Sequence, residues 1–440
     1  MSVTRRQFLG RSAAAVLVAG TMTRGKVFGA NDRIRVGVVG IHGRGGSHID
    51  GFSGLDDSEV VALCDCDRNV LAARAKQLEE RCGKKPKTYV DMRELIADGE
   101  IDAVSFATPN HWHTLGTVWA CEAGKDVYVE KPLSHEVWEG RQLVAAAKRW
   151  NRIVQHGTQR RSEANWVRAM QRLAAGEIGE VYMARALCFK RRNAIGEGVE
   201  MEPPEHLDWT LWQGPATERP YKDYPNKQGD EGFYVHYNWH WCWHYGNGDI
   251  GNQGVHQMDV ALWGLDKGFP TRVVSMGGRY GYEDGGETAN TQVSTFQYAD
   301  GTMLVFEVRG RYTNNEAGAM VGNLFYGSEG YMVEDKLYDK NGKQLPDPEE
   351  KSLSEVGVDG NHFYSFVKAV QSRNQDDVQG TALDGHLSSA HCHLANISYR
   401  IGRELHFDPK TERFVGEGAT EGNELLRRAC RAGFEVPELA

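Results

Sequence analysis

The stretch Ile34–Gly46 reads IRVGVVGIHGRGG, and it decides the fold of the first part of the chain. The apolar residues Ile34–Val39 are expected to form a buried strand, since a short apolar run bounded by glycine is typical of a parallel sheet. The run Gly40–Gly46 predicts a tight turn, and a helix is expected over Ser47–Leu55. A glycine turn between a strand and a helix is a place where phosphate groups bind.

Individual positions of this turn fit a dinucleotide. Gly40 permits the sharp turn, and the later glycines let the backbone approach a pyrophosphate at the helix N-terminus. His42 stands where a second glycine is expected, so the diphosphate contact is expected to be modified. The residues of the turn predicted to contact the cofactor are Gly40, His42, Gly43, Arg44 and Gly45. A purely structural glycine turn in another α/β fold is the alternative.

Asp65 adds a second sign of dinucleotide binding. It closes the predicted strand Val60–Cys64, 25 residues after Gly40. A carboxylate at this place accepts hydrogen bonds from the adenosine ribose and repels a 2′-phosphate. The sequence therefore predicts NAD as the cofactor, in preference to NADP.

Strands and helices continue to alternate up to His156. Further strands are predicted at Ala103–Ala107, Asp126–Val129 and Ile153–His156, and helices at Asn69–Cys82, Thr114–Ala123 and Trp138–Trp150. This alternation indicates a doubly wound parallel sheet with helices on both faces. We expect a Rossmann domain over residues 31–156.

The pattern changes after His156. Strands follow one another without helices between most of them, at Val181–Phe189, Val273–Met276, Thr291–Gln297, Thr302–Arg309 and Asn323–Gly327. Such a run is typical of an open, mainly antiparallel sheet, so residues 157–440 are predicted to form an α+β domain with C-terminal helices over 361–403. The segment Asp208–His244 is rich in Trp, Tyr, Pro and Gly, and is expected to be an irregular insertion.

Composition excludes several classes of protein. The 440 residues are 40% hydrophobic and 25% charged, as in a globular protein. No apolar stretch reaches the roughly 18–20 residues of a membrane span. The formal net charge is −9 and no basic stripe stands out, so nucleic acid is not an expected partner. The eight scattered cysteines form no CxxC pair and predict neither a zinc knuckle nor a disulfide framework.

The N-terminus has the layout of an export signal. Thr4–Leu9 reads TRRQFL and precedes an Ala/Val-rich run, which is typical of a twin-arginine signal over residues 1–30. We therefore expect the twin-arginine export machinery as a partner and a periplasmic or otherwise exported location. A basic amphipathic helix is the alternative.

Five stretches together carry a resemblance to a known family. They read ATPNHWH (107–113), AGKDVYVEKPL (123–133), GTQRR (157–161), GDIGNQGVHQMD (248–259) and YGSEG (326–330). In these stretches residues 31–405 resemble the Gfo/Idh/MocA family, named for glucose–fructose oxidoreductase and inositol dehydrogenase, and an exported subgroup of it. The resemblance implies binding of NAD(P) and action on a sugar or cyclitol.

The resemblance also implies roles for single residues. Glu130 and Lys131 are expected beside the nicotinamide, with Lys131 also touching the reacting hydroxyl. The residues implied to line the cofactor are Thr108, Asn110 and His113.

A histidine is implied as the proton-transfer residue, and this is His256. The family usually has Asp four residues earlier, where this chain has Asn252. An amide cannot accept a proton, so a two-residue relay is in doubt, and Asp249 or Asp259 are the candidates to compensate. The predicted catalytic set is Lys131, His256 and Asn252.

These residue types suit the oxidation of a secondary alcohol. A histidine with its ordinary pKa near 6.5 accepts the hydroxyl proton, and a lysine ammonium stabilises the developing alkoxide. The alternatives are a strand-end surface lysine for Lys131 and a core histidine for His256. Charged and polar side chains predicted to bind substrate are Arg160, Arg161, Lys190, His240, Asp249 and His256. Each of the three cations has a solvated surface charge as its alternative.

The run His236–His244 places three histidines at intervals of four residues. No Asp or Glu follows at ligand spacing, so no metal is predicted. The tryptophans between the histidines fit either a wall that stacks on a sugar ring or a buried aromatic cluster.

Three functions remain open from sequence. The first is an NAD-dependent oxidoreductase that transfers a hydride from a ring hydroxyl of a sugar, glycoside or cyclitol. The second is an NAD-dependent glycosidase or lyase that retains its cofactor through a cycle of oxidation, elimination and reduction. The third is a non-catalytic binder of sugar or nucleotide. A homo-oligomer, a dimer or tetramer, is expected because an open sheet face commonly pairs with another subunit.

Overall fold

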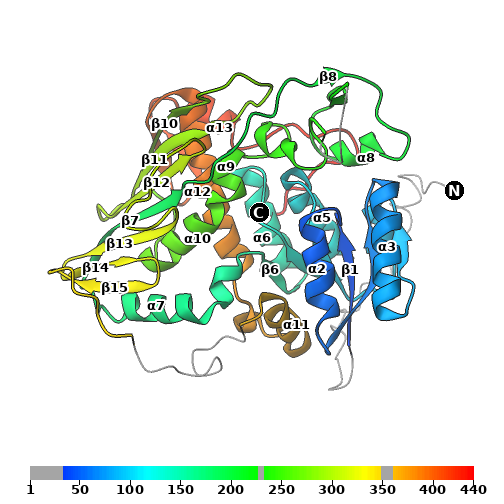
Figure 1. The fold of residues 1–440 in the computed structure, drawn as a ribbon, viewed down its shortest axis with the longest axis horizontal. Coiled ribbons are helices and arrows are strands. Elements are labelled where there is room, and N and C mark those ends of the chain that lie inside the picture. Colours follow the sequence, from blue (N-terminus) through cyan, green and yellow to red (C-terminus); the bar gives the residue numbers. More distant parts are fainter. Residues whose placement is uncertain (1–32, 226–231, 348–359) are drawn as a thin grey trace.

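The computed structural model describes residues 33–225, 232–347 and 360–440 (Figure 1). The export signal predicted for residues 1–30 lies outside these ranges. Among the helices that the structure describes, none is long and apolar enough to cross a membrane.

The first sheet is parallel throughout, as the alternation of strands and helices predicts. Its six strands lie in the order β3-β2-β1-β4-β5-β6, which is the order of dinucleotide-binding folds. The strands are β1 (Ile34–Val39), β2 (Ser58–Cys64), β3 (Lys87–Tyr89), β4 (Ala103–Phe106), β5 (Asp126–Val129) and β6 (Val154–His156). Because β1 lies between β2 and β4, the chain reverses its direction of winding at the carboxyl end of β1. A ligand crevice is expected at such a switch point.

Two helices of this part begin earlier than expected. The helices are α2 (Arg44–Ser53), α3 (Arg68–Cys82), α4 (Met92–Ile96), α5 (Asn110–Glu122) and α6 (Val137–Arg149). Helix α2 starts inside the glycine turn because Gly45 has no side chain: a Cβ there would lie 2.0 Å from the Gly40 carbonyl oxygen. Helix α5 starts directly after Pro109, whose φ of −58° suits a helix N-terminus.

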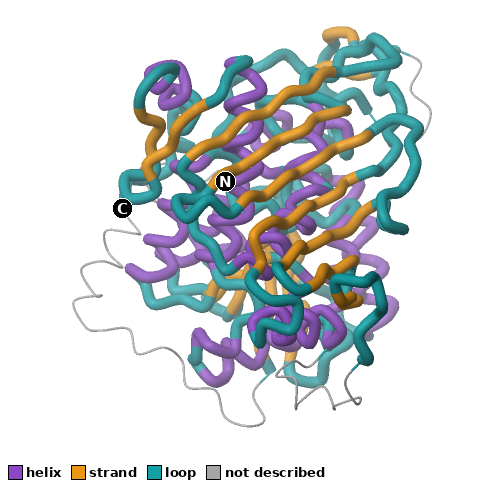
Figure 2. The backbone as a smooth tube through the Cα atoms, turned by 90° about the vertical axis from the view of Figure 1, so that its left-hand side faces the viewer, coloured by secondary structure: helices purple, strands orange, loops and turns teal. Residues whose placement is uncertain are grey.

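The second sheet has nine strands in the order β15-β14-β13-β7-β12-β11-β10-β16-β17. Neighbours are antiparallel except for β7 and β12, which run parallel, so the expected mainly antiparallel sheet is confirmed. Figure 2 shows its strands side by side with the helices behind them. The strands are β7 (Val181–Cys188), β10 (Arg272–Gly278), β11 (Thr291–Gln297), β12 (Met303–Arg309), β13 (Val321–Gly327), β14 (Gly330–Val333), β15 (Lys336–Asp339), β16 (Leu405–Asp408) and β17 (Arg413–Val415).

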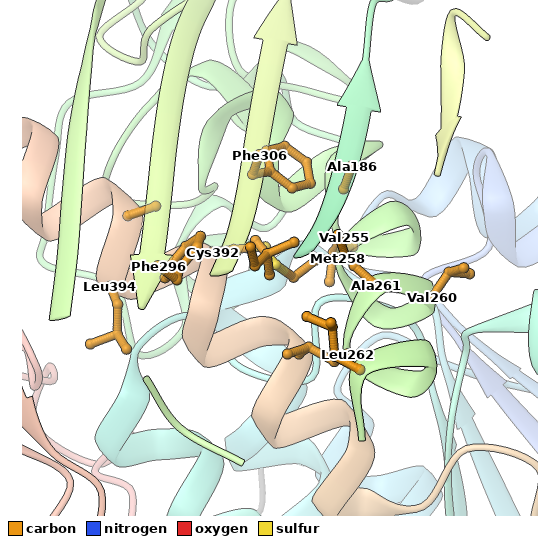
Figure 3. Close-up of a cluster of buried hydrophobic side chains, with 14 of the residues drawn as sticks. Ala186, Val255, Met258, Val260, Ala261, Leu262, Phe296, Phe306, Cys392 and Leu394 are labelled. Carbon is orange, nitrogen blue, oxygen red and sulfur yellow. The ribbon is translucent and has the colours of Figure 1, made fainter. Parts of the chain in front are cut away.

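One face of this sheet packs on helices α10 (Gly254–Leu265) and α12 (Ala382–Ile401). Figure 3 shows the resulting core, in which Phe306 and Ala186 of the sheet face Val255 and Met258 of α10, and Cys392 of α12 lies beside them. The outer face of the sheet keeps large apolar side chains in solvent, among them Met276, Tyr182 and Val293. This core holds α10 rigidly behind the site described below.

Late parts of the chain complete the core of the first domain. In helix α11 (His362–Ser372), Phe363 packs on Tyr128 of β5 with ring centroids 5.1 Å apart, and Phe366 lies in the same cluster. Near the C-terminus, Phe434 packs edge-on against Trp112 of α5 at 5.6 Å. The two structural parts are thus joined by more than the segment that follows β6.

The segment Asp208–His244, here called the insertion, includes α8 (Trp209–Gln213), β9 (Lys222–Asp223) and the 3₁₀ turn Asn238–Trp241. Its buried aromatic residues form a small core of their own, which includes Trp212, Tyr221 and Tyr234. Figure 1 shows the described parts of this segment, 208–225 and 232–244 in green, lying over the ends of the blue and cyan Rossmann elements. Backbone contacts described below place it against the loop after β2.

Candidate active site

A cavity of about 400 Å³ lies along the carboxyl edge of the parallel sheet. This volume is within the usual range of ligand pockets. The strand ends and the loops after them contribute Val39, Gly40, His42, Gly43, Arg44, Cys64, Asp65, Cys66, Val90, Asp91, Met92, Ala107, Thr108, Pro109, Asn110, Glu130 and Lys131, and α5 contributes Trp112. The opposite wall comes from the insertion and α9 (Gly248–Asn252), through Leu211, Trp212, His236, Tyr237, Trp239, His240 and Asn252. The cavity thus crosses the ends of five neighbouring strands, from β3 to β5.

The glycine turn has the geometry of a phosphate-binding turn. Gly40 has φ of +77°, and a Cβ there would lie 2.8 Å from the Thr108 backbone nitrogen. A Cβ on Gly43 would meet nothing within 4 Å, so the backbone is open at the start of α2. No side chain caps this helix, which leaves its N-terminal dipole for a ligand.

Asp65 lies in the cavity at the end of β2 and is 9% exposed. Its carboxylate accepts the backbone N–H of Ile41 at 2.9 Å and that of Asp67 at 3.0 Å. Burial raises the pKa of Asp65, while these two N–H groups act against that rise. The carboxylate is therefore held in place by the turn that it adjoins.

Glu130 is the centre of a buried network at the end of β5. Its carboxylate accepts hydrogen bonds from Arg44 Nε at 2.7 Å and Gln159 Nε2 at 3.2 Å, and lies 3.1 Å from His48 Nε2. Burial alone would raise the pKa of Glu130, but hydrogen bonding to His48 and the charge of Arg44 hold it well below its usual range. Glu130 is thus an anion whose charge is matched by Arg44 next to the glycine turn.

Lys131 and Asn252 meet across the cavity. The Lys131 ammonium donates a hydrogen bond to the Asn252 carbonyl oxygen at 2.8 Å. Burial lowers the pKa of Lys131, and the charge of Glu130 acts against this. Two of the three ammonium N–H groups have no partner within the described residues, so the group can donate to a ligand hydroxyl.

Tyr237 is a site residue that the sequence did not suggest. Its phenolic oxygen accepts hydrogen bonds from Arg192 Nη1 at 3.1 Å and from Asn252 Nδ2 at 3.3 Å. Arg192 is fixed in turn by Asp249, with contacts of 2.6 and 3.0 Å. Because both lone pairs of the phenol are engaged, its O–H is left to donate. Asn252 therefore links Lys131, through its carbonyl, to Tyr237, through its amide.

The two histidines predicted near the reaction are neutral. Burial, followed by the charge of Lys131, lowers the pKa of His256 to about 3. The same causes place the pKa of His240 well below its usual range, and His240 Nδ1 is buried with no partner in the described part of the chain. His240 lines the cavity and packs on Trp239 with centroids 3.6 Å apart, whereas His256, on α10, is not among the lining residues.

Other predicted residues have structural partners. Arg161 forms an ion pair with Asp259 at 2.8 Å, so Asp259, like Asp249, is already engaged by an arginine. Arg160 lies 4.9 Å from the centre of the Trp166 ring. Lys190 is exposed and donates to Gln253 Oε1 at 3.2 Å.

The three residues implied to line the cofactor are ordered by neighbouring loops. Asn110 donates to Asn247 Oδ1 at 2.9 Å. The ring nitrogens of His113 lie 2.6 Å from the Pro132 carbonyl oxygen and 2.9 Å from that of Thr108. Thr108 and Asn110 line the cavity, and His113 supports them from behind.

The three histidines of the insertion do not converge. His236 stacks on His42, His240 packs on Trp239, and His244 is half-buried near Arg219. Among the described residues, no three His, Cys, Asp or Glu side chains are grouped as metal ligands would be. All eight cysteines are free thiols.

Two family profiles match the chain and together cover most of it. The description "Oxidoreductase family, NAD-binding Rossmann fold" matches residues 34–158, and "Oxidoreductase family, C-terminal alpha/beta domain" matches residues 192–436. The second match alone covers more than half of the 440 residues.

Curated relatives align over about a third of this chain. A glycosyl hydrolase family 109 protein of Shewanella pealeana is 33% identical over 172 residues, which is 34% of this chain and 38% of the relative. Inositol 2-dehydrogenase 1 of Saccharopolyspora erythraea is 32% identical over 163 residues, 37% of this chain and 46% of the relative. The matched segment thus spans less than half the length of either protein.

Solved structures share the fold over nearly their whole length. The WlbA dehydrogenase of Bordetella pertussis, solved with NADH and UDP-GlcNAcA, gives a TM-score of 0.64 at 18% identity, covering 86% of this chain and 98% of its own. GenD2 from gentamicin A biosynthesis, solved with NAD, gives 0.62 at 21% identity, covering 88% and 100%. With the two profile matches, the fold and the cavity at the switch point, these results show that the chain belongs to the Gfo/Idh/MocA family of NAD-binding oxidoreductases.

Proposed function

We propose that the protein is an NAD-dependent oxidoreductase that transfers a hydride from a ring hydroxyl of a sugar, glycoside or cyclitol. The observation that carries this proposal is the position of Lys131. Its ammonium lies in the same cavity as the glycine turn and Asp65, with N–H groups available beyond its bond to Asn252.

The residues of the cavity fit NAD. The open backbone at Gly43 and the uncapped start of α2 suit a diphosphate, and Asp65 suits an adenosine ribose without a 2′-phosphate. Glu130, Lys131, Thr108 and Asn110 would hold the nicotinamide end. When bound, the nicotinamide supplies the hydride acceptor.

Lys131 would donate to the reacting hydroxyl and stabilise negative charge on its oxygen. His240, which is neutral and lines the cavity, is able to accept a hydrogen bond from a ligand hydroxyl, and His256 on α10 stays the proton-transfer residue that the family resemblance implies. The O–H group of Tyr237 would donate a hydrogen bond to the sugar or cyclitol ring of the substrate and so orient it. The predicted cations Arg160 and Lys190 remain candidates for outer substrate contacts, whereas Arg161 is occupied by Asp259.

A second candidate is a closed redox cycle that cleaves a glycoside. In it, a ring carbon is oxidised, the neighbouring C–H becomes acidic and its proton leaves. The substituent is then eliminated, water adds, and the first carbon is reduced again, so that no net reduction of NAD remains. The name of the Shewanella relative, a glycosyl hydrolase, favours this candidate, as does the predicted export, because free NAD is scarce outside the cytoplasm.

The location and assembly are part of the proposal. The TRRQFL motif supports twin-arginine export to the periplasm. The exposed Met276, Tyr182 and Val293 on the outer sheet face support self-association into a dimer or tetramer.

The first experiment is to purify the exported protein, dialyse it extensively, denature it and quantify released NAD(H) by mass spectrometry. Near-stoichiometric nucleotide, together with cleavage in a panel of p-nitrophenyl glycosides without net NADH, would support the closed cycle. Nucleotide-free protein that forms NADH with added NAD and a sugar or cyclitol panel would support the dissociable dehydrogenase. Protein that neither retains nor binds NAD would refute both.

A further inference from the structure

We propose that the insertion is the second half of the dinucleotide site. We propose further that it slows the release of NAD through the contacts of His236 with His42 and Asp67. This inference rests on the NAD site described above, and it concerns residues for which the family resemblance implied no role. It is carried by contacts between the insertion and the Rossmann loops on either side of Asp65.

The first residue of the insertion and the two residues before it are joined to the loop after β2 by backbone contacts. Arg68 N–H donates to the His206 carbonyl at 2.8 Å, and Asp208 N–H donates to the Cys66 carbonyl at 3.0 Å. Asp67 and Leu207 form an antiparallel bridge between these two bonds. The start of the insertion is therefore held by an isolated β-bridge to Asp67, two residues after the carboxylate predicted to hold the ribose.

A pair of stacked rings closes the glycine turn. The His42 and His236 rings lie 4.2 Å apart at an angle of 11°. His236 Nε2 is 3.1 Å from the Asp67 carboxylate, whose other oxygen caps α3 through the N–H groups of Asn69 and Val70. Although burial acts in the opposite direction, hydrogen bonding to His236 contributes to lowering the pKa of Asp67. The ring of His42, which stands where a glycine is expected in the turn, is thus held by His236 of the insertion.

The insertion also supplies apolar surface along the cavity. Leu211 and Trp212 line it together with Val90 and Met92, which follow β3. Trp212 is held by Trp209, with stacked rings 4.8 Å apart, and its carbonyl oxygen lies 2.9 Å from His111 Nε2 of α5. This wall excludes water from one side of the cavity, so a bound dinucleotide would be enclosed between two anchored surfaces.

If the contacts of His236 with His42 and Asp67 retain the cofactor, weakening them should speed cofactor release. Protein loaded with NADH is mixed with excess NAD in a stopped-flow instrument, and the loss of bound NADH fluorescence gives the release rate. We expect His236→Ala to raise this rate about tenfold or more. Asp67→Asn keeps the oxygen that caps α3 but loses the charge facing His236, so a smaller rise is expected. His236→Phe keeps a ring for stacking and tests the contribution of the stack alone.

The matched control is His406→Ala, an exposed histidine on β16 of the second sheet, and its rate should stay within twofold of the parent. Unfolding temperature and far-UV circular dichroism identify any variant that fails to fold, in which case Asp67→Asn decides. Release rates within twofold of the parent in both His236 variants and in Asp67→Asn would overturn the inference while leaving the proposed function intact. Failure of the parent to bind NADH would overturn the proposed function and this inference together.

Discussion

Of the two walls of the cavity, the one built from strand ends carries charge, whereas the one built from the insertion carries rings. Glu130, Lys131, Arg44 and Asp65 belong to the first wall. Trp212, His236, Tyr237, Trp239 and His240 belong to the second. The strand-end wall holds the groups that would bind the cofactor and polarise a hydroxyl. The aromatic insertion wall would exclude water and so would strengthen the interactions of those charges, because electrostatic interactions grow as the local dielectric falls.

This difference predicts separate roles for the two walls, and these roles can be tested by substitution. On the strand-end wall, changes at Lys131 should reduce the chemical step and leave cofactor retention unaltered, whereas changes at Asp65 should alter the preference between NAD and NADP. On the insertion wall, changes at His236 should alter cofactor retention, and changes at Tyr237 should alter substrate orientation. Only Asn252, which touches both Lys131 and Tyr237, should affect both.

The largest effect is expected for Lys131→Ala. Loss of the ammonium removes the donor to the reacting oxygen, and loss of one such donor typically costs about 10²–10³-fold in kcat. Turnover is measured on whichever substrate the panels identify, and NAD content is measured in parallel. Lys340→Ala, an exposed lysine after β15, is the control. Equal turnover in parent and Lys131→Ala would remove Lys131 from the chemistry.

Tyr237→Phe removes only the phenolic oxygen of the insertion wall, and so tests the role of that hydroxyl in substrate binding. The hydroxyl accepts from Arg192 and Asn252 and is left with one donor for the substrate. We expect kcat/KM to fall roughly 10- to 100-fold, in line with the loss of a hydrogen bond in a charged network. Bound NAD should be unchanged, which separates this role from that of His236. Tyr182→Phe on the outer sheet face is the control, and a fall in both variants would count against a specific role.

The strand-end wall could be predicted from sequence, because local patterns encode it. The run Gly40–Gly46 and the carboxylate Asp65 are placed by their distance from β1 and β2, whereas the role of Lys131 at the end of β5 was implied by the family resemblance. Short-range spacing determines which side chains meet at one edge of a parallel sheet.

The insertion wall could not be predicted, because its partners are distant in sequence. His42 and His236 are nearly 200 residues apart, and no periodicity joins them. Asp249 and Asp259 were candidates to replace a missing carboxylate, but long-range arginines occupy both. The aromatic run around Tyr237 indicated a wall or a cluster, without showing that the phenol meets Asn252.

Acid should weaken the molecule because several of its histidines are buried and neutral. Burial lowers the pKa of His362 and of His391 to about 4. The unfolded chain, with a histidine pKa near 6.5, binds more protons in this range, so stability present above pH 6.5 is lost as the pH falls toward 4. Each of the two should cost about 2 kcal/mol at pH 5. Thermal unfolding at pH 7.5 and pH 5 measures this.

A measurement of NADH release at the same two pH values tests the insertion wall, because His111 contacts Trp212 of that wall. Burial places the pKa of His111 well below its usual range, and this ring supports Trp212. The His111 ring should therefore stay neutral in the folded protein, and NADH release should be the same at pH 5 as at pH 7.5 until global unfolding. An unfolding temperature that is equal or higher at pH 5, or NADH release that quickens at pH 5 before global unfolding, would contradict the expected role of the neutral histidines.

The smallest expected effect is a change of cofactor preference in Asp65→Asn. The substitution keeps one oxygen for the Ile41 or Asp67 N–H but removes the charge that would repel a 2′-phosphate. A screened interaction between two such charges is worth about 1–2 kcal/mol, so the preference for NAD over NADP should fall about tenfold. Dissociation constants for both cofactors measure this, and Asp300→Asn, on an exposed turn of the second sheet, is the control. If the preference persists in Asp65→Asn, discrimination lies elsewhere along the cavity, and Asp91 beside Val90 and Met92 becomes the next carboxylate to replace.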